Sequence, residues 1–338
     1  MLRILSTLVL LLIFTCESGL GQTPAELVAL LSEGHKKLAL CEASHSQYRW
    51  SLKARSPLES KNTNQEYSTH NSYGICYRAG EQLMFEEGKI VDVEGVMKPD
   101  AKRGRMCRSN NYTFVVENNT VNSGWKLKFF DDKNPKESFA EVVGGTLPAL
   151  FPLRTLVDQW KIEDILANET CKISSVRPNN NGSIVADFFV RVGPDKSMIL
   201  KGTFTASKDN DFVITECQYN LTDSANTNSH YQSTMTREVE KVGTQIRCRS
   251  LIFKGKNTLT GKIDFEEHYQ FSDYSSDVVD PSQFELEYYG IASPKDGMAL
   301  PRKRTTWPIW IGITAISLIL AIIFRGLAQR RKKRSLQL

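Results

Sequence analysis

The fold is decided by residues 169–220, which read ETCKISSVRPNNNGSIVADFFVRVGPDKSMILKGTFTASKDNDFVITECQYN. Turn-forming residues at 179–182, 194–195 and 208–210 divide this run into four segments in which apolar and polar residues alternate. Such alternation is typical of strands that bury one face, so the run predicts a four-strand antiparallel meander. In one register the four strands sort into an apolar and a mostly polar face, as such a meander requires.

The predicted register arranges the apolar face in rows that cross the strands. The central row consists of Cys171, Val190, Leu200 and Cys217. The flanking rows are Ile173 with Phe188, Val192 with Met198 and Tyr219, and Phe204 with Val213. The other face carries Lys172, Ser174, Asp187, Arg191, Lys201, Thr203, Thr205, Glu216 and Gln218, with Phe189, Ile199, Phe212 and Ile214 as apolar exceptions. An apolar face of this extent requires a cover.

Residues 23–55 predict a helix followed by a strand. Thr23 and Glu26 have the spacing of a capping box, and Pro24 stands at the preferred first helical position. The apolar stripe of this helix consists of Leu27, Leu31, Gly34, Leu38 and Cys41. From residue 48 to 55 the period changes to two, with Tyr48, Trp50, Leu52 and Ala54 on the apolar side. We expect the helix to cover the sheet.

Further strands are predicted on both sides of the meander. They fall at 73–79, 81–86, 89–94, 111–117 and 124–130 before it, and at 235–252 (a hairpin), 262–271 and 283–290 after it. A second, mid-chain helix is predicted from Leu153, Leu156, Val157 and Trp160, which share one helical face. The predicted fold class is therefore α+β: a curved antiparallel half-barrel of about ten strands, covered by the N-terminal and mid-chain helices.

Both ends of the chain carry membrane-related sequences. Residues 1–21 combine Arg3, a short apolar run and a Gly-Leu-Gly ending, which predicts a secretory signal peptide. Residues 307–324 contain no charge, and as a helix they would span roughly 27 Å, enough for one pass through a bilayer. Six Lys or Arg follow this span and three precede it, which places the C-terminus in the cytoplasm. The predicted parts are therefore an extracytoplasmic domain at 22–300, a linker at 301–306, a transmembrane helix at 307–324 and a basic cytoplasmic tail at 325–338.

The charge balance changes when the ends are set aside. The whole chain has 43 Lys and Arg against 38 Asp and Glu, but ten of the basic residues and one acidic residue lie in 1–21 and 302–338. The remaining 33 bases and 37 acids give residues 22–301 a net charge of −4. This balance argues against a nucleic-acid partner and predicts that the basic tail faces lipid headgroups.

Six cysteines lie in the predicted exported domain, at 41, 76, 107, 171, 217 and 248. Six cysteines allow 15 disulfide pairings, and the spacings contain no CxxC or CxxH metal motif. In the predicted meander Cys171, Cys217 and Cys248 are too far apart across the strands to bond to one another. Each of the three is expected to be a buried small hydrophobic residue or to bond to a cysteine of the covering helix, such as Cys41. Cys76 with Cys107 is the favoured pairing outside the meander. Five N-x-S/T sequons occur, at Asn111, Asn118, Asn168, Asn181 and Asn220.

No motif in the chain predicts a reaction, a metal or a cofactor. Residues 255–263 (GKNTLTGKI) have the wrong spacing for a phosphate-binding loop, and Ile263 stands where a magnesium ligand belongs. The acidic run at 264–273 has no glycine-punctuated calcium loop and fits a solvated strand face. The five histidines lie in no nucleophile motif. The sequence therefore predicts a protein that is not an enzyme.

The helix and strand at 23–55, the meander at 169–220 and the stretch at 283–291 ending FELEYYGI together resemble the LolA-like half-barrel superfamily. That family includes periplasmic lipoprotein carriers and envelope-stress sensor domains. The resemblance implies a cavity between sheet and helices that binds acyl chains. The chain departs from soluble carriers because it has a predicted membrane anchor.

Two functions follow as expectations. The first is an anchored extracytoplasmic protein that binds an apolar ligand, a lipid or a lipoprotein, on the apolar sheet face. Its candidate binding residues are Phe188, Val190, Leu200, Phe204, Val213 and Tyr219. The alternative is a structural or partner-binding envelope module whose core is packed and dry.

Overall fold

The computed structural model describes residues 23–57, 67–93, 96–120, 123–143, 147–157, 160–179, 182–193, 196–223 and 231–292. The chain divides into one unit of Met1–Ile291 and another of Ala292–Leu338, and only Ala292 of the second unit is described. The predicted signal peptide, linker, transmembrane helix and basic tail lie outside the described residues. Within the described ranges, no helix is both long and apolar enough to span a membrane.

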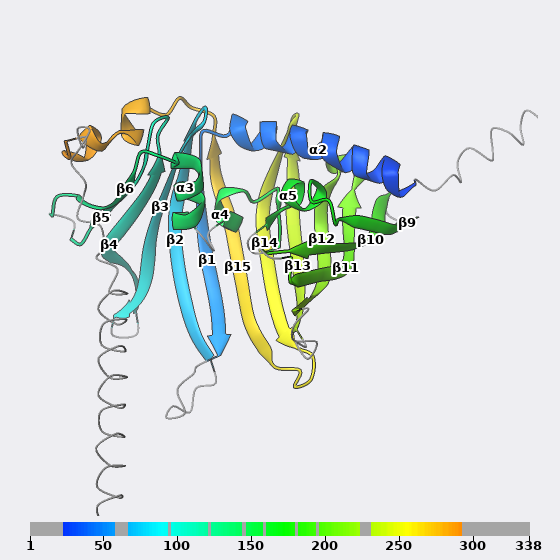
Figure 1. The fold of residues 1–338 in the computed structure, drawn as a ribbon. Coiled ribbons are helices and arrows are strands. Elements are labelled where there is room, and N and C mark those ends of the chain that lie inside the picture. The colour runs from blue at the N-terminus through cyan, green and yellow to red at the C-terminus, as the bar shows by residue number, and fades with distance from the viewer. Residues whose placement is uncertain are drawn as a thin grey trace, which may run out of the picture. The chain divides into compact units, whose positions relative to one another are not determined.

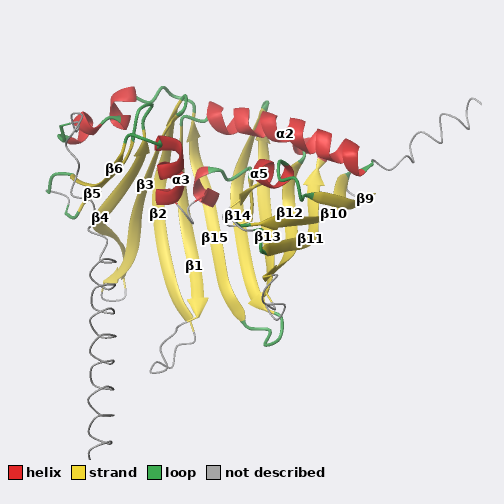
Figure 2. Cartoon of the chain, in the orientation of Figure 1, coloured by secondary structure: helices red, strands yellow, loops and turns green. Residues whose placement is uncertain are grey.

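One antiparallel sheet of 13 strands dominates the described structure (Figures 1 and 2). Its spatial order is β6-β5-β4-β3-β2-β1-β15-β14-β13-β12-β11-β10-β9. The strands are β1 (Gln47–Pro57), β2 (Tyr67–Ala79), β3 (Gln82–Val93), β4 (Val96–Arg108), β5 (Thr113–Asn118), β6 (Lys126–Asp131), β9 (Lys172–Pro178), β10 (Ser183–Val192), β11 (Met198–Ser207), β12 (Val213–Asp223), β13 (Tyr231–Val242), β14 (Gln245–Asn257) and β15 (Ile263–Ser275). Sequence neighbours pair throughout except where β1 meets β15, which joins the two halves of the chain in one sheet.

Helix α2 (Pro24–Ser44) crosses the sheet at one end of the strands (Figure 1). Its predicted capping box is confirmed: Thr23 Oγ1 accepts from the Glu26 backbone N–H at 3.2 Å, and Glu26 Oε2 accepts from the Thr23 backbone N–H at 2.8 Å. The predicted stripe residues Leu27, Leu31 and Leu38 are fully buried. Gly34 is required at its position because a Cβ there would collide with the backbone carbonyl of Asp211. The helix therefore lies closer to the sheet than a larger side chain would permit.

A mid-chain insertion covers the same face of the sheet as α2. It consists of α3 (Pro135–Val143), α4 (Leu147–Leu150), the two-stranded pair β7 (Thr155–Val157) and β8 (Trp160–Lys161), and α5 (Ile162–Leu166). The predicted mid-chain helix through Leu153 and Trp160 is therefore wrong. Side chains of the sheet bind backbone carbonyls of the insertion: Tyr48 Oη donates to those of Ala149 and Leu150 at 2.7 and 2.9 Å. These backbone carbonyls of the insertion thus find hydrogen-bond partners although the insertion does not form one long helix.

Buried charged residues form hydrogen bonds and ion pairs that hold the insertion between α2 and the sheet. Glu42, at the end of α2, accepts from the Leu153 backbone N–H at 2.8 Å and from Arg154 Nε at 2.6 Å. The Arg154 guanidinium also contacts Glu163 of α5 at 2.6 Å. From the sheet, Arg237 of β13 donates to the backbone carbonyls of Thr155 and Ile214. Because breaking a buried ion pair is costly, these contacts fix the position of the insertion.

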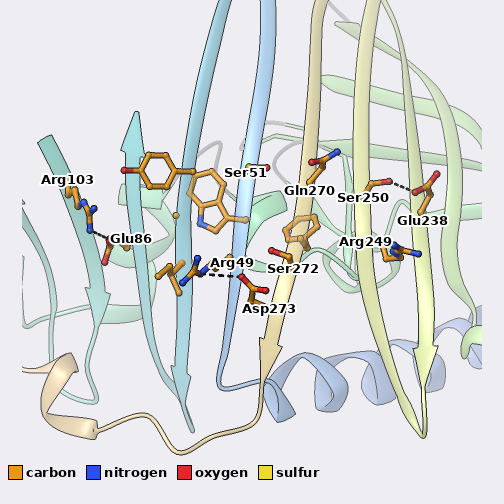
Figure 3. A pocket seen from close by; sticks show the side chains of 15 residues that line it. Arg49, Ser51, Glu86, Arg103, Glu238, Arg249, Ser250, Gln270, Ser272 and Asp273 are labelled. Atoms are coloured by element: carbon orange, nitrogen blue, oxygen red, sulfur yellow. Dashed lines mark hydrogen bonds and ion pairs between the residues drawn. The ribbon is translucent and has the colours of Figure 1, made fainter. Parts of the chain in front are cut away.

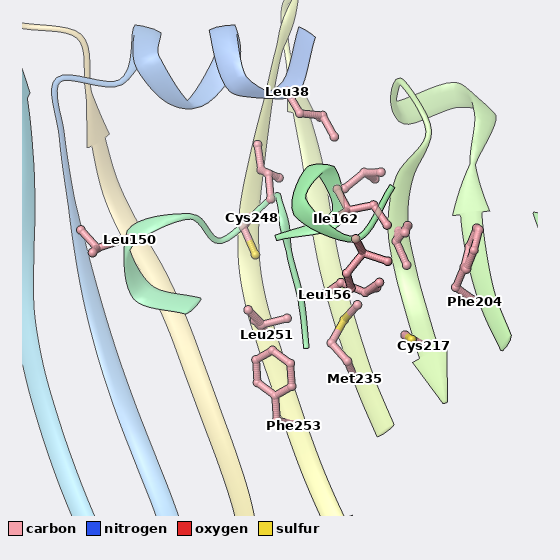
Figure 4. Packing of buried hydrophobic residues seen from close by; sticks show 14 of the residues in the cluster. Leu38, Leu150, Leu156, Ile162, Phe204, Cys217, Met235, Cys248, Leu251 and Phe253 are labelled. Atoms are coloured by element: carbon pink, nitrogen blue, oxygen red, sulfur yellow. The ribbon is translucent and has the colours of Figure 1, made fainter. Parts of the chain in front are cut away.

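The hydrophobic core lies between the sheet and the cover of α2 and the insertion. We call the covered side the inner face. Figure 4 shows Leu38 of α2, Leu156 and Ile162 of the insertion, and Met235 and Leu251 of the sheet in one cluster. A second, smaller cluster lies on the opposite, outer face around Met84, Cys107 and Phe114 of β3–β5. There the short helices η4 (Pro281–Phe284) and η5 (Leu286–Tyr289) cover the sheet with Phe284, Leu286 and Tyr289.

The register of the meander is partly as predicted. Ile173 pairs with Phe188, Val190 with Leu200, and Val192 with Met198, as predicted. Between β11 and β12 the predicted register is wrong, since Leu200 pairs with Leu221 and Phe204 pairs with Cys217. The turn is longer than expected, because η3 (Lys208–Asn210) is followed by Asp211 and Phe212, both with positive φ. As far as Thr205 the displacement is four residues, an even number, so these side chains keep their predicted faces. Beyond Thr205 a β-bulge reduces the displacement to three residues, and Ile214, predicted on the polar face, is buried in the core.

The predicted fold class, an α+β half-barrel of about ten strands under two helices with a transmembrane helix, is corrected. The described structure is mainly β: one antiparallel sheet of 13 strands with few helices. The predicted strand at 283–290 is also wrong, because Pro281 and the capping side chain of Asp280 begin the 3₁₀ turns η4 and η5 there. The predicted Cys76–Cys107 disulfide does not form, since the two thiols are free and lie in different clusters.

Candidate functional site

A large hollow in the described structure lies on the outer face of the sheet, away from the apolar core. Its volume is about 850 Å³, and it extends across the strands from β4 to β13 (Figure 3). We call it the outer trough. Its lining residues are Arg49, Trp50, Ser51, Tyr73, Gly74, Ile75, Glu86, Arg103, Glu238, Arg249, Ser250, Gln270, Phe271, Ser272 and Asp273. The lining combines hydroxyl, amide and charged side chains, and none of these residues is a histidine or a cysteine.

Strand alternation explains why polar side chains gather in the outer trough. On β1, Tyr48 and Trp50 point to the inner core, so Arg49 and Ser51 between them point to the outer face. On the neighbouring strand β15, Ser272 pairs with Arg49 and Gln270 pairs with Ser51, which brings these four side chains to one surface.

Two β-bulges on neighbouring strands interrupt the regular sheet at the trough. In β15 the pairing with β1 shifts beside Asp273, which has a φ of 52°. In β14 the pairing with β13 shifts beside Arg249, so that Ser250 pairs with Glu238 but Cys248 pairs with Val239. A bulge bends its strand and turns two successive side chains toward the same side. The bulges therefore aim Ser272 with Asp273, and Arg249 with Ser250, at the outer face.

Two arginines of the trough pair with its carboxylates, whereas Arg249 pairs with Glu240 outside the lining. Arg49 Nε lies 3.4 Å from Asp273 Oδ2, and each side chain is 62% exposed. Arg103 and Arg105 both bind the buried Glu86 carboxylate, at 3.3 and 2.7 Å. Burial lowers the pKa of Arg105, but Glu86 and the adjacent Tyr289 outweigh that effect, and the net shift is upward. An exposed pair such as Arg49–Asp273 is weak and can exchange its partners for a ligand at little cost.

The trough also holds polar groups that have no partner side chain. The side chains of Ser51, Gln270 and Ser272 make no hydrogen bond to another residue in the described part of the chain. Ser250 Oγ, in contrast, donates to Glu238 Oε2 at 2.9 Å. Tyr73 packs its ring on Gly88, where a Cβ would approach the ring to 2.9 Å, and its hydroxyl is buried without a hydrogen-bond partner among the described residues. These groups can donate to or accept from a ligand without first breaking a bond within the protein.

The lining carries no net charge. Arg49, Arg103 and Arg249 balance Glu86, Glu238 and Asp273. Within the described residues no group of three or more His, Cys, Asp or Glu side chains could hold a metal ion. The arrangement suits reversible binding of an uncharged ligand through many hydrogen bonds.

The six residues predicted to bind an apolar ligand lie together, but not at a hollow. Phe188 and Val190 of β10, Leu200 and Phe204 of β11, and Val213 and Tyr219 of β12 are all buried in the inner core. The two smaller cavities, of about 270 and 480 Å³, are lined by other residues. A ligand could reach the six side chains only if α2 or the insertion moved away. Their role as ligand-binding residues stays a prediction.

The outer trough was not predicted from the sequence. Its polar residues stand at strand positions that are typical of an ordinary solvated face. The bulges that bring them together depend on pairing between β1, β13, β14 and β15, which the sequence does not specify locally. The presence of Arg49 and Ser51 on the outer side of β1 was the one available signal.

Comparison with known proteins gives no further assignment. No protein-family model matches the chain, and no curated protein is significantly similar to it. The LolA-like resemblance therefore stays a prediction.

Proposed function

We propose that this chain is a non-enzymatic binding module of the cell envelope, anchored in the cytoplasmic membrane by residues 307–324. Its binding surface is the outer trough, and its ligand is an uncharged, hydroxyl-rich polymer, that is, a glycan. The observation that carries the proposal is the lining of the trough: hydroxyl and amide groups without partners among the described residues, beside charged residues whose formal charges sum to zero.

The chemistry of a sugar fits this lining. Each sugar hydroxyl both donates and accepts, so it can bind an Arg–carboxylate pair such as Arg49–Asp273 through both members. A strongly anionic or cationic ligand gains nothing from a lining of zero net charge. A protein partner is less well matched, because the centres of protein interfaces are depleted of charged residues and rich in aromatic and apolar anchors.

The packing of the inner face favours this surface over the apolar one. The six candidate residues on β10–β12 are at most 3% exposed, and side chains of α2 and the insertion already fill the space above them. An acyl chain would have to displace that cover. Binding at the outer trough needs no such rearrangement.

A pair of matched substitutions tests the proposal. Gln270 and Gln218 are both exposed on the outer face, the first in the trough and the second on β12 outside it. Full-length protein in lipid nanodiscs is applied to an array of immobilised neutral oligosaccharides. We expect Gln270→Trp, which fills the trough, to abolish binding, and Gln218→Trp to leave it unchanged. The absence of binding by the wild type, or equal loss in both variants, contradicts the proposal.

A further inference from the structure

A separate small cavity lies between α2 and α5, on the covered side of the sheet. Its volume is about 270 Å³. It is lined by Ser32, His35, Lys36, Ala39, Arg154, Glu163, Leu166 and Ala167. Neither the outer trough nor the predicted apolar site includes any of these residues.

The cavity contains buried polar atoms without partners. Both ring nitrogens of His35 and the Oε2 atom of Glu163 are buried and have no hydrogen-bond partner among the described residues. His35 is only 3% exposed. Buried polar atoms in native proteins are nearly always paired with protein or with another molecule. Three such atoms on two residues that line one cavity therefore point to an occupant.

The protonation of His35 defines what the cavity offers. Burial, assisted by the charges of Arg237 and Arg154, lowers the pKa of His35 to about 3. The imidazole is therefore neutral at pH 7, with one nitrogen as donor and the other as acceptor. Glu163 Oε1 binds Arg154 at 2.6 Å, which leaves Oε2 as a second acceptor. The cavity thus presents one donor and two acceptors beside the apolar side chains of Ala39, Leu166 and Ala167.

We propose that this cavity binds a small primary carboxamide with a short aliphatic body. The carbonyl oxygen of the amide accepts from the His35 ring N–H, and one of its N–H groups donates to Glu163 Oε2. A carboxylate can accept from the His35 N–H but has no hydrogen to donate to Glu163 Oε2. An ammonium group would meet Arg154 and Lys36, and it has no acceptor for the His35 N–H.

The test uses butyramide as the probe, with two compounds of similar shape as controls. 2-Pentanone keeps the carbonyl but lacks the N–H donors, and butyrate is anionic. Binding to the full-length protein in detergent micelles is measured by saturation-transfer NMR. We expect saturable binding of butyramide, and at least tenfold weaker binding of the other two compounds. If butyramide does not bind saturably, water alone fills the cavity and the proposal is wrong; equal binding of 2-pentanone overturns it as well.

Two histidine variants locate the binding. His35→Phe keeps an aromatic ring in the cavity but removes both nitrogens, and should abolish butyramide binding. His268→Phe changes a partly exposed histidine on β15 that pairs with Glu266, outside the cavity, and should leave binding unchanged. Butyramide binding that survives His35→Phe overturns the proposal. Circular dichroism checks the fold of each variant, and if His35→Phe does not fold, the comparison of amide with ketone in the wild type still decides.

Discussion

Replacing Glu42 should destabilise the fold far more than replacing another glutamate on the same helix. Glu42 is 2% exposed and accepts hydrogen bonds from Arg154 and from the Leu153 backbone N–H. Glu42→Leu removes both acceptors and leaves a buried backbone donor and a mostly buried guanidinium. Loss of one partner from a buried ion pair costs about 3–5 kcal/mol, and an orphaned buried N–H costs about 1–3 kcal/mol. Arg154 keeps its contact with Glu163, so we expect the total to lie near 3–5 kcal/mol.

Glu33→Leu is the matched control. Glu33 also lies on α2 and also pairs with a cation, Lys37, at 3.3 Å, but both side chains are more than half exposed. Leu and Glu have similar helix propensities, so the two substitutions differ mainly in burial. We expect Glu33→Leu to change the free energy of unfolding by less than about 1 kcal/mol. Urea unfolding monitored by tryptophan fluorescence measures both. Effects of equal size, or a loss below about 1 kcal/mol for Glu42→Leu, would refute the claim that Glu42 fastens the insertion.

Three further outcomes are expected. Trp50→Ala removes an indole stacked on Phe85 and should lower the free energy of unfolding, measured in urea, by about 3–5 kcal/mol. Lys53→Ala, on the outer side of the same strand, should lower it by less than about 0.5 kcal/mol. Equal losses would mean that the strand faces are misassigned. Because the pKa of His35 is depressed from 6.5 to about 3, its stabilising contribution is complete above pH 6.5 and is lost as the pH falls toward 3. Between pH 7 and pH 5 the wild type should lose about 2 kcal/mol more stability than His35→Phe, and parallel pH profiles would contradict a buried neutral imidazole. The structure has four buried thiols, those of Cys76, Cys107, Cys217 and Cys248. They should resist iodoacetamide in the native protein and react after unfolding, which peptide mass spectrometry measures. Rapid labelling of the native protein would contradict their burial.

The sequence predicted those elements whose signal is local. The capping box at Thr23 and the alternation at 48–55 each lie within a few residues, and α2 and β1 form where they were expected. Most of the faces of the meander were also predictable, because a strand period of two is not altered by the four-residue shift between β11 and β12; Ile214, beyond the bulge, is the exception. The shift itself was not predictable, since it depends on how Asp211 and Phe212 extend the turn.

Strands with unusual residues were missed or divided. Glu87-Gly88 reads as a turn, but β3 runs through it because the Tyr73 ring of β2 occupies the space beside Gly88. Strand β4 contains Pro99 and few apolar residues, and was not predicted. Pro99 is tolerated because this part of β4 pairs with β3, whereas pairing with β5 begins at Arg103. In both cases a neighbouring strand decides the structure.

The candidate site was the least predictable part. Its residues come from seven strands and are brought together by the closure of β1 on β15 and by two bulges. Each strand contributes only one to three polar residues with ordinary spacing. A continuous apolar face, by contrast, gives the same sequence pattern whether protein side chains or a ligand cover it. For this reason the sequence predicted a binding site in the inner core.

The central claim is that the apolar face of β10–β12 is packed and holds no lipid, and that glycan binding takes place at the outer trough. Native mass spectrometry of the full-length protein, purified from its own membranes and released from detergent, tests the first half of that claim most directly. The account predicts that no lipid remains bound to the polypeptide once the detergent is stripped. A stoichiometric lipid that survives this treatment, and that organic extraction then recovers, would contradict it and would return the ligand to the apolar face of β10–β12.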